Sequence, residues 1–267
     1  MITGRIDKTC FRVFVQMRNT IIMRPPLPRL LAFLITTMLP GALLAEAAPK
    51  PPPGLYETRA EHDPNGIGVF YMGREIAHVM GHQAADWLER PERDEEEGTD
   101  RMVEALRFHD GEVVADIGCG SGYVSRKISK RVGGSGRIYG VDIQPEMLAL
   151  LAKRMAMFRI TNVQPVRGAI TDPQVPPASC DTMIMVDVYH EFDHPYEMIE
   201  SMIAGLKPGG RIVFVEYRGE DPEVPIKLVH KMTEAQVKKE MTVHPQLSFS
   251  ETLEDLPRQH IIIFRKE

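Results

Sequence analysis

The sequence predicts an α/β protein whose central sheet is doubly wound and mostly parallel. Two observations carry this prediction. From residue 112 onward, short apolar runs typical of buried strands alternate with longer segments of helical periodicity. A glycine-rich segment at residues 118–122 lies between the first of these runs and the first helix, where a tight turn is needed. We therefore expect a sheet with helices on both faces.

Strands and helices follow one another regularly in this part of the chain. We expect strands at residues 113–116, 137–142, 163–167, 182–188 and 211–217, and helices at residues 123–132, 145–158 and 195–206. Pro145 fits the first turn of its helix, because an amide hydrogen at that position has no partner within the helix.

The C-terminal segment has a different pattern. Thr233 and Gln236 have the spacing of a capping box, which predicts a helix that continues to Met241. Two further strands are expected at residues 247–253 and 259–265. With no helix between them, these strands should form a hairpin at the edge of the sheet.

The region before the sheet is expected to contain helices. Ile76, Val79 and Met80 recur at helical spacing. The expected parts are a linker and turn-rich segment at residues 48–72, a helical cap at 73–108 with helices at 74–88 and 95–108, and the sheet-containing domain at 109–267. The cap either covers a ligand as a lid or packs on the sheet as an amphipathic extension.

Residues 1–47 resemble a signal for export. Arg18, Arg24 and Arg29 lie before an apolar run at residues 30–45, and small residues follow at 45 and 47. This order is typical of a secretory signal peptide, and the run is short for a transmembrane helix. We expect cleavage after residue 47 and a periplasmic or secreted protein. An uncleaved membrane anchor is the alternative.

The composition limits the kinds of partner. Hydrophobic residues make up 43% of the chain, enough for a core, and the formal net charge is −5. The first 47 residues carry six basic and two acidic side chains, so the remainder is more acidic still. An acidic body repels phosphate backbones, so no nucleic-acid partner is expected. The sequence contains no CxxC pair, and no metal is expected.

The loop after the first strand predicts the cofactor. Asp116 lies two residues before Gly118, the first of the three glycines Gly118, Gly120 and Gly122. A carboxylate there is a poor neighbour for a pyrophosphate. It suits a ligand with an ammonium and a sulfonium group, which favours S-adenosylmethionine over NAD. Asp142 ends the second strand, where an acidic side chain can accept hydrogen bonds from ribose hydroxyls.

Residues 112–218 resemble the class I S-adenosylmethionine-dependent methyltransferase superfamily. The matching segments are residues 113–122, 140–143, 181–187 and 206–211. The resemblance implies a Rossmann-like, seven-stranded sheet with an antiparallel C-terminal edge. It also implies that the three glycines lie along the cofactor, that Asp116 faces its amino-acid end and that Asp142 holds its ribose. Ala169 departs from the family, which often has an acidic residue there.

The segment after the fourth strand has two interpretations. His190, Glu191 and His194 fit the H-E-x-x-H pattern of zinc hydrolases, which requires both histidines on one helix. A loop is favoured instead, because Pro195 fits a helix start better than a helix interior. Asp187, His190 and Glu191 are then candidate bases or acceptor ligands, or they only order the loop.

The sequence therefore favours a methyltransferase that acts on a small molecule or a protein side chain. A module that binds S-adenosylmethionine without catalysis is the alternative, and a zinc hydrolase is a weaker one.

Overall fold

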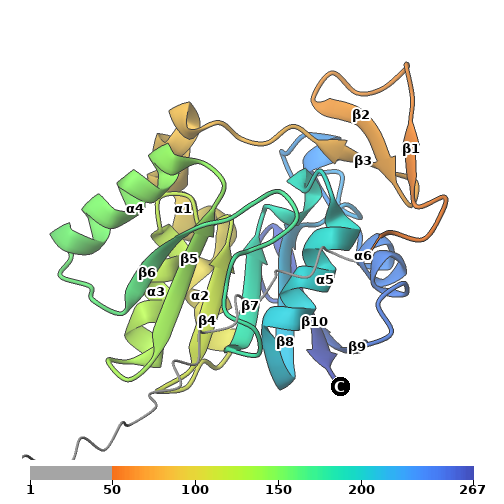
Figure 1. Ribbon diagram of the computed structural model, residues 1–267. Coiled ribbons are helices and arrows are strands. Elements are labelled where there is room, and N and C mark those ends of the chain that lie inside the picture. Colours follow the sequence, from red (N-terminus) through yellow and green to blue (C-terminus); the bar gives the residue numbers. More distant parts are fainter. Residues whose placement is uncertain (1–49) are drawn as a thin grey trace, which may run out of the picture. The chain divides into compact units, whose positions relative to one another are not determined.

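A seven-stranded sheet forms the centre of the computed structural model, which describes residues 50–267 (Figure 1). Its strand order is β6-β5-β4-β7-β8-β10-β9. The strands are β4 (Val113–Ile117), β5 (Arg137–Asp142), β6 (Val163–Arg167), β7 (Cys180–Val186), β8 (Leu206–Tyr217), β9 (Leu247–Leu253) and β10 (Gln259–Lys266). The first five are parallel, whereas β10 is antiparallel to both β8 and β9. The predicted fold class and antiparallel edge are confirmed. Of the two hairpin strands, β10 pairs with β8, and β9 forms the outer edge of the sheet.

Helices cover both faces of this sheet, as predicted. Those of the sheet-containing domain are α3 (Tyr123–Val132), α4 (Pro145–Met157), α5 (Pro195–Gly205) and α6 (Glu234–Met241). One apolar core joins the sheet to α5 and α6, and a second joins its other face to α3 and α4. Because neighbouring residues of a strand point to opposite faces, Val114 lies in one core and Ala115 in the other.

The ends of these helices follow local sequence signals. Pro145 and Pro195 occupy the first turns of α4 and α5. Thr233 caps α6, and its hydroxyl oxygen accepts a hydrogen bond from the amide of Gln236 at 3.1 Å. The side chain of Gln236 does not complete the capping box, because it donates to Glu240 and to the carbonyl of Met72.

The prediction of a helix at residues 74–88 is wrong. Residues 74–77 form β3 (Arg74–Ala77), which pairs with β2 (Gly66–Tyr71), and β2 pairs with β1 (Tyr56–Thr58) in a separate three-stranded sheet. Met72 and Gly73 connect β2 and β3 with φ angles of 49° and 96°. Positive φ at both central positions is typical of a two-residue hairpin turn. A 3₁₀ helix, η1 (His82–Glu89), follows β3.

The helix predicted at residues 95–108 is interrupted. Its residues contribute to α1 (Arg93–Glu97) and α2 (Thr99–Ala105), which are separated by Gly98 in a left-handed conformation with φ of 66°. The cap is therefore a small sheet followed by short helices rather than two long helices. α2 adds Met102 and Val103 to the core that contains α3 and α4.

The predicted signal peptide, residues 1–47, lies outside the described residues, so cleavage and export stay predictions. Among residues 50–267, no helix is both long and apolar enough to cross a membrane.

Candidate functional site

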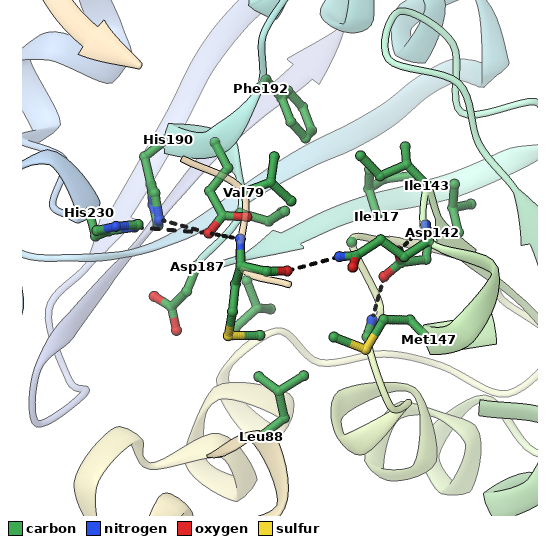
Figure 2. A pocket seen from close by; sticks show the side chains of 18 of the residues that line it. Val79, Leu88, Ile117, Asp142, Ile143, Met147, Asp187, His190, Phe192 and His230 are labelled. Carbon is green, nitrogen blue, oxygen red and sulfur yellow. Dashed lines mark hydrogen bonds and ion pairs between the residues drawn. The ribbon is translucent and has the colours of Figure 1, made fainter. Parts of the chain in front are cut away.

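A cavity of about 500 Å³ lies where the loops after β4, β5, β6 and β7 meet. These strands are parallel, so their carboxyl ends open on one edge of the sheet, where ligands bind in doubly wound folds. The segment between β3 and α1 also lines the cavity, through Val79, Met80, Trp87 and Leu88. Figure 2 shows His190 and His230 on the side of the cavity opposite Asp142.

The glycine loop after β4 forms part of the cavity wall through Gly118 and Gly120. Both residues have positive φ, 70° and 51°. A β-carbon at Gly118 would lie 2.4 Å from Val188, and one at Gly120 would lie 2.5 Å from Leu88. The positive φ angles favour glycine at both positions, and the branched side chain of Val188 leaves no room for a side chain at Gly118. Both residues line the cavity with backbone atoms only.

Asp142 connects this loop to the end of β5. Its carboxylate accepts hydrogen bonds from the amides of Gly120, at 3.0 Å, and Gln144, at 2.8 Å. It also lines the cavity, although only 7% of its surface is exposed. Burial raises the pKa of this carboxyl above its usual value, and the two amide donors oppose that shift. The side chain is thus held rigidly at the place predicted for a ribose contact.

Asp116 and Gly122 lie behind the wall of the cavity rather than in it. Asp116 is 2% exposed and accepts a hydrogen bond from the hydroxyl of Ser125. Gly122 precedes α3, and Leu151 fills the space that a side chain would need. Neither residue is among those that line the cavity, and their predicted contacts with the cofactor stay predictions.

Replacing Asp116 with asparagine is expected to stabilise the ligand-free protein at neutral pH. Burial, helped by Asp142, raises the pKa of Asp116 to about 6. The folded-state pKa of Asp116 exceeds the unfolded value, so the folded protein favours the protonated carboxyl. The contribution of Asp116 to stability is therefore fully present below pH ~4 and is lost as pH rises through ~6. Asp116→Asn should therefore increase the free energy of unfolding by about 1–3 kcal/mol at pH 7 and hardly change it at pH 4.

Urea unfolding at both pH values measures this difference. Asp86→Asn, on the exposed surface, is the matched control and should have little effect at either pH. Equal free energies of unfolding for wild type and Asp116→Asn at pH 7 would contradict the expected cost of burying a charged carboxylate at position 116.

The loop after β6 contributes an apolar part of the cavity wall. Gly168, Ala169 and Ile170 line it, together with Ile143 and Met147, which follow β5. Ala169 and Asp172 exchange backbone hydrogen bonds across a short turn. Asp172 is not among the lining residues, so its carboxylate does not replace the acidic side chain that Ala169 lacks.

Asp187, directly after β7, has a constrained position beside the cavity. Its φ is 53°, which is uncommon for a residue other than glycine. One carboxylate oxygen accepts a hydrogen bond from Gln259 at 2.7 Å, and the other is buried without a partner in residues 50–267. Burial raises its pKa well above the usual value, and the neighbouring carboxylates of Glu97 and Glu216 add to this effect.

A buried charged network surrounds Asp187, and the sequence did not predict its involvement. Glu97 accepts hydrogen bonds from Arg90, from Arg93 and from the hydroxyl of Tyr217. Arg93, Glu97 and Tyr217 all line the cavity. Arg90 and Arg93 are close to Glu97 in sequence, and Arg93 has the i,i+4 spacing of a helical ion pair. Tyr217 lies 120 residues away, so only the fold brings it into this cluster.

His190 is held firmly beside the same cavity, in the 3₁₀ turn η2 (Tyr189–Glu191). Its Nδ1 lies 2.5 Å from Glu216, which also accepts a hydrogen bond from the amide of Tyr189. Arg74 donates to the carbonyl of His190 and forms a buried ion pair with Glu240. Burial lowers the pKa of His190, but Glu216 outweighs it, so the pKa is raised above its usual value.

Glu191 connects this side of the cavity to the segment that covers it. Its carboxylate accepts a hydrogen bond from the amide of Met80 at 3.1 Å. The carbonyl of Met80 accepts in turn from Gln144, and Gln144 accepts from the amide of His82. Burial raises the pKa of Glu191 to about 7. Thus residues 79–88, and not a helix at 74–88, form the cover over the cavity.

The structure does not support the H-E-x-x-H interpretation. His190 lies in η2, whereas His194 precedes the first residue of α5 and contacts Tyr56 edge-on. The two histidines therefore do not share a helix, and the zinc-hydrolase alternative based on them is wrong. Among the described residues, the groups that could approach one ion are His190, Glu191 and His230.

Comparisons with known proteins agree with this geometry. A family model described as a methyltransferase domain matches residues 114–210. The 2-phytyl-1,4-naphtoquinone methyltransferase of Thermosynechococcus vestitus is 26% identical over 143 residues, 53% of this chain and 54% of that protein. The mitochondrial ubiquinone biosynthesis O-methyltransferase of Schizosaccharomyces pombe is 27% identical over 119 residues, 43% of this chain and 42% of that protein.

The chain thus spans about half the length of the curated relatives it matches. Among solved structures, a SAM-dependent methyltransferase from Aquifex aeolicus superposes with a TM-score of 0.67 at 18% identity. The match covers 71% of this chain and 100% of the other, and at this identity it shows the shared fold.

Proposed function

This chain carries a domain of the class I S-adenosylmethionine-dependent methyltransferase superfamily, and from that premise we propose that it methylates a small, largely apolar acceptor. The observation that carries the proposal is a single cavity with two kinds of wall. One side holds Gly118, Gly120 and Asp142, and the other holds Asp187, His190 and Glu191. Donor and acceptor could therefore lie against each other in one cavity.

The residues on the first side fit S-adenosylmethionine. The bare backbone at Gly118 and Gly120 lets a flat or extended ligand approach closely, and the carboxylate of Asp142 suits ribose hydroxyls. When bound, the cofactor supplies an electrophilic methyl group on sulfur.

The residues on the second side can orient an acceptor and take up its proton. Asp187, His190 and Glu191 all line the cavity, and hydrogen bonds to Gln259, Glu216 and Met80 fix their positions. Much of the rate of an in-line methyl transfer comes from such positioning, and a base is needed only for an acceptor that must lose a proton. Three polar side chains fixed here favour an enzyme over a module that only binds the cofactor.

Three observations favour a small acceptor over a protein side chain. The segment at residues 79–88 crosses the cavity and is hydrogen-bonded to both sides of it through Gln144 and Glu191. Val79, Leu88, Phe192 and Ile226 make much of the wall apolar. The curated relatives are named for naphthoquinone and ubiquinone biosynthesis, and an aromatic ring with a hydroxyl group fits such a wall.

Transfer of a labelled methyl group from S-adenosylmethionine to a panel of hydroquinones, catechols and model peptides tests the proposal. We expect incorporation into at least one hydroxylated aromatic compound and none into peptides. Incorporation into peptides alone would refute the small-molecule acceptor. Cofactor binding with no transfer to any compound of the panel would favour the binding module.

A further inference from the structure

Three metal-binding side chains converge in the wall of the cavity. His190, Glu191 and His230 each offer one ligand atom, and these atoms all lie within 4.8 Å of one another. The carboxylate Oε1 of Glu191 lies 4.0 Å from Nε2 of His190 and 3.9 Å from Nδ1 of His230. The three residues come from two 3₁₀ turns, η2 and η3 (Leu228–His230), which contact each other (Figure 2).

The two imidazoles have no partner in the protein for the atoms that face this point. Within residues 50–267, neither Nε2 of His190 nor any ring nitrogen of His230 makes a hydrogen bond, and both residues line the cavity. The distances to Glu191 exceed hydrogen-bond length. The three polar side chains therefore surround a common space without forming hydrogen bonds to one another.

Glu216 gives this group the outer support that metal-binding histidines usually have. Its carboxylate is fully buried and contacts Nδ1 of His190. A carboxylate at one ring nitrogen fixes the tautomer and leaves the other nitrogen, Nε2, with its lone pair directed at the ligand. The same carboxylate is anchored by the amide of Tyr189 at 2.9 Å.

The spacing is close to that of a coordinated ion. A tetrahedral zinc ion with bonds of about 2.1 Å holds its ligand atoms about 3.4 Å apart. The two separations from Glu191, 4.0 and 3.9 Å, would have to shorten by about half an ångström. The ligand atoms of the two imidazoles lie within 4.8 Å and would approach by at most about 1.4 Å, which rotation of the partly exposed His230 side chain can supply. Two imidazoles and one carboxylate suit Zn²⁺, Fe²⁺ or Co²⁺ and are a poor set for Mg²⁺, which prefers oxygen ligands.

We propose that His190, Glu191 and His230 bind one divalent transition-metal ion in the wall of the cavity, with Glu216 orienting His190. A set of three protein ligands leaves a coordination position open toward the cavity. In a part of the proposal that rests on the proposed function, an acceptor hydroxyl at that position would lose its proton more readily. The proposal differs from the prediction drawn from the sequence that no metal is bound.

Metal content measured without cofactor or acceptor tests the site independently of methyl transfer. The untagged full chain is stripped with a chelator, exposed to Zn²⁺ or Mg²⁺, passed through a desalting column and measured by mass spectrometry. We expect about one zinc per chain and no retained magnesium. Co²⁺ should give the visible absorption of a low-coordinate site.

His230→Ala is the principal variant because its side chain is 22% exposed and its loss disturbs the core little. It should abolish zinc retention and the cobalt spectrum while the unfolding temperature of the metal-free protein stays near that of wild type. His194→Ala is the matched control and should keep both signals, since His194 lies outside the cluster. Glu216→Gln should retain the site but weaken zinc affinity by roughly 10- to 100-fold.

Failure of the wild-type chain to retain zinc would overturn the site, as would equal retention by His230→Ala. Loss of zinc in His194→Ala but not in His230→Ala would likewise overturn the proposed site, because the ion would then be bound without His230. If His230→Ala loses zinc but methylates the acceptor at the wild-type rate, the role of the ion in activating the acceptor is refuted.

Discussion

Asp142→Ala is expected to weaken binding of S-adenosylhomocysteine by roughly 10- to 100-fold, about 1–3 kcal/mol. Two losses combine in this variant. The ribose hydroxyls lose an acceptor, and the amides of Gly120 and Gln144 lose the carboxylate that anchors them. The glycine loop should therefore become less ordered as well as less complementary to the ligand. Isothermal titration calorimetry with S-adenosylhomocysteine measures the change and requires no acceptor.

Asp172→Ala is the control for this measurement. Asp172 follows the neighbouring strand β6, but its carboxylate binds Gln174 and is not part of the cavity wall. We expect it to leave the affinity within about twofold of wild type. Unchanged affinity in Asp142→Ala would show that the cofactor does not use this side of the cavity.

The sheet could be predicted because its signals are local. The strand at residues 137–142 and the helix at residues 123–132 were predicted with the observed bounds. Each is a run of one periodicity that ends at a turn residue, and such runs determine secondary structure with little help from distant contacts. The glycine loop and Asp142 could be placed for the same reason, since the loop directly follows β4 and Asp142 is the last residue of β5.

The cap was mispredicted because its apolar residues do not pack as a helix. Val79, Met80 and Leu88 recur at spacings that resemble a helical face, yet they form the wall of the cavity. Periodicity cannot distinguish a helix that packs on a core from an irregular segment that covers a ligand. The turn at Met72 and Gly73, between an apolar strand and a second one, was the available sign of a hairpin.

The remaining site residues had no detectable signal in the sequence. His230 lies 39 residues after Glu191 in a segment without periodicity, and only the fold brings it near. In contrast, the adjacent H-E-x-x-H pattern directed attention to His194, which lies apart. Glu97 and Gln259 reach Asp187 from the cap and from β10 in the same way. Such constellations depend on tertiary contacts that one sequence does not reveal.

Asp187→Asn is expected to lower the turnover number by roughly 100-fold or more while leaving affinity for S-adenosylhomocysteine within a few-fold of wild type. Asparagine has the same shape, tolerates the positive φ of 53° and can still accept the hydrogen bond from Gln259. The variant should therefore fold like the wild type, so any fall in turnover reports the loss of the carboxylate and not of the fold. Turnover on the acceptor and calorimetry on the same preparation separate the two effects.

The pH profile distinguishes a proton acceptor from a residue that only orders the loop. Burial and the carboxylates of Glu97 and Glu216 raise the pKa of Asp187 well above its usual value, so its charged form appears only as pH rises. If the charged form takes up the acceptor proton, wild-type turnover should climb with pH, and Asp187→Asn should lack that rise. Asp193→Asn, a carboxylate in the same loop, should keep the wild-type profile. An unchanged profile in Asp187→Asn would assign proton uptake to another group on that side of the cavity, because no ionisable carboxyl remains at position 187.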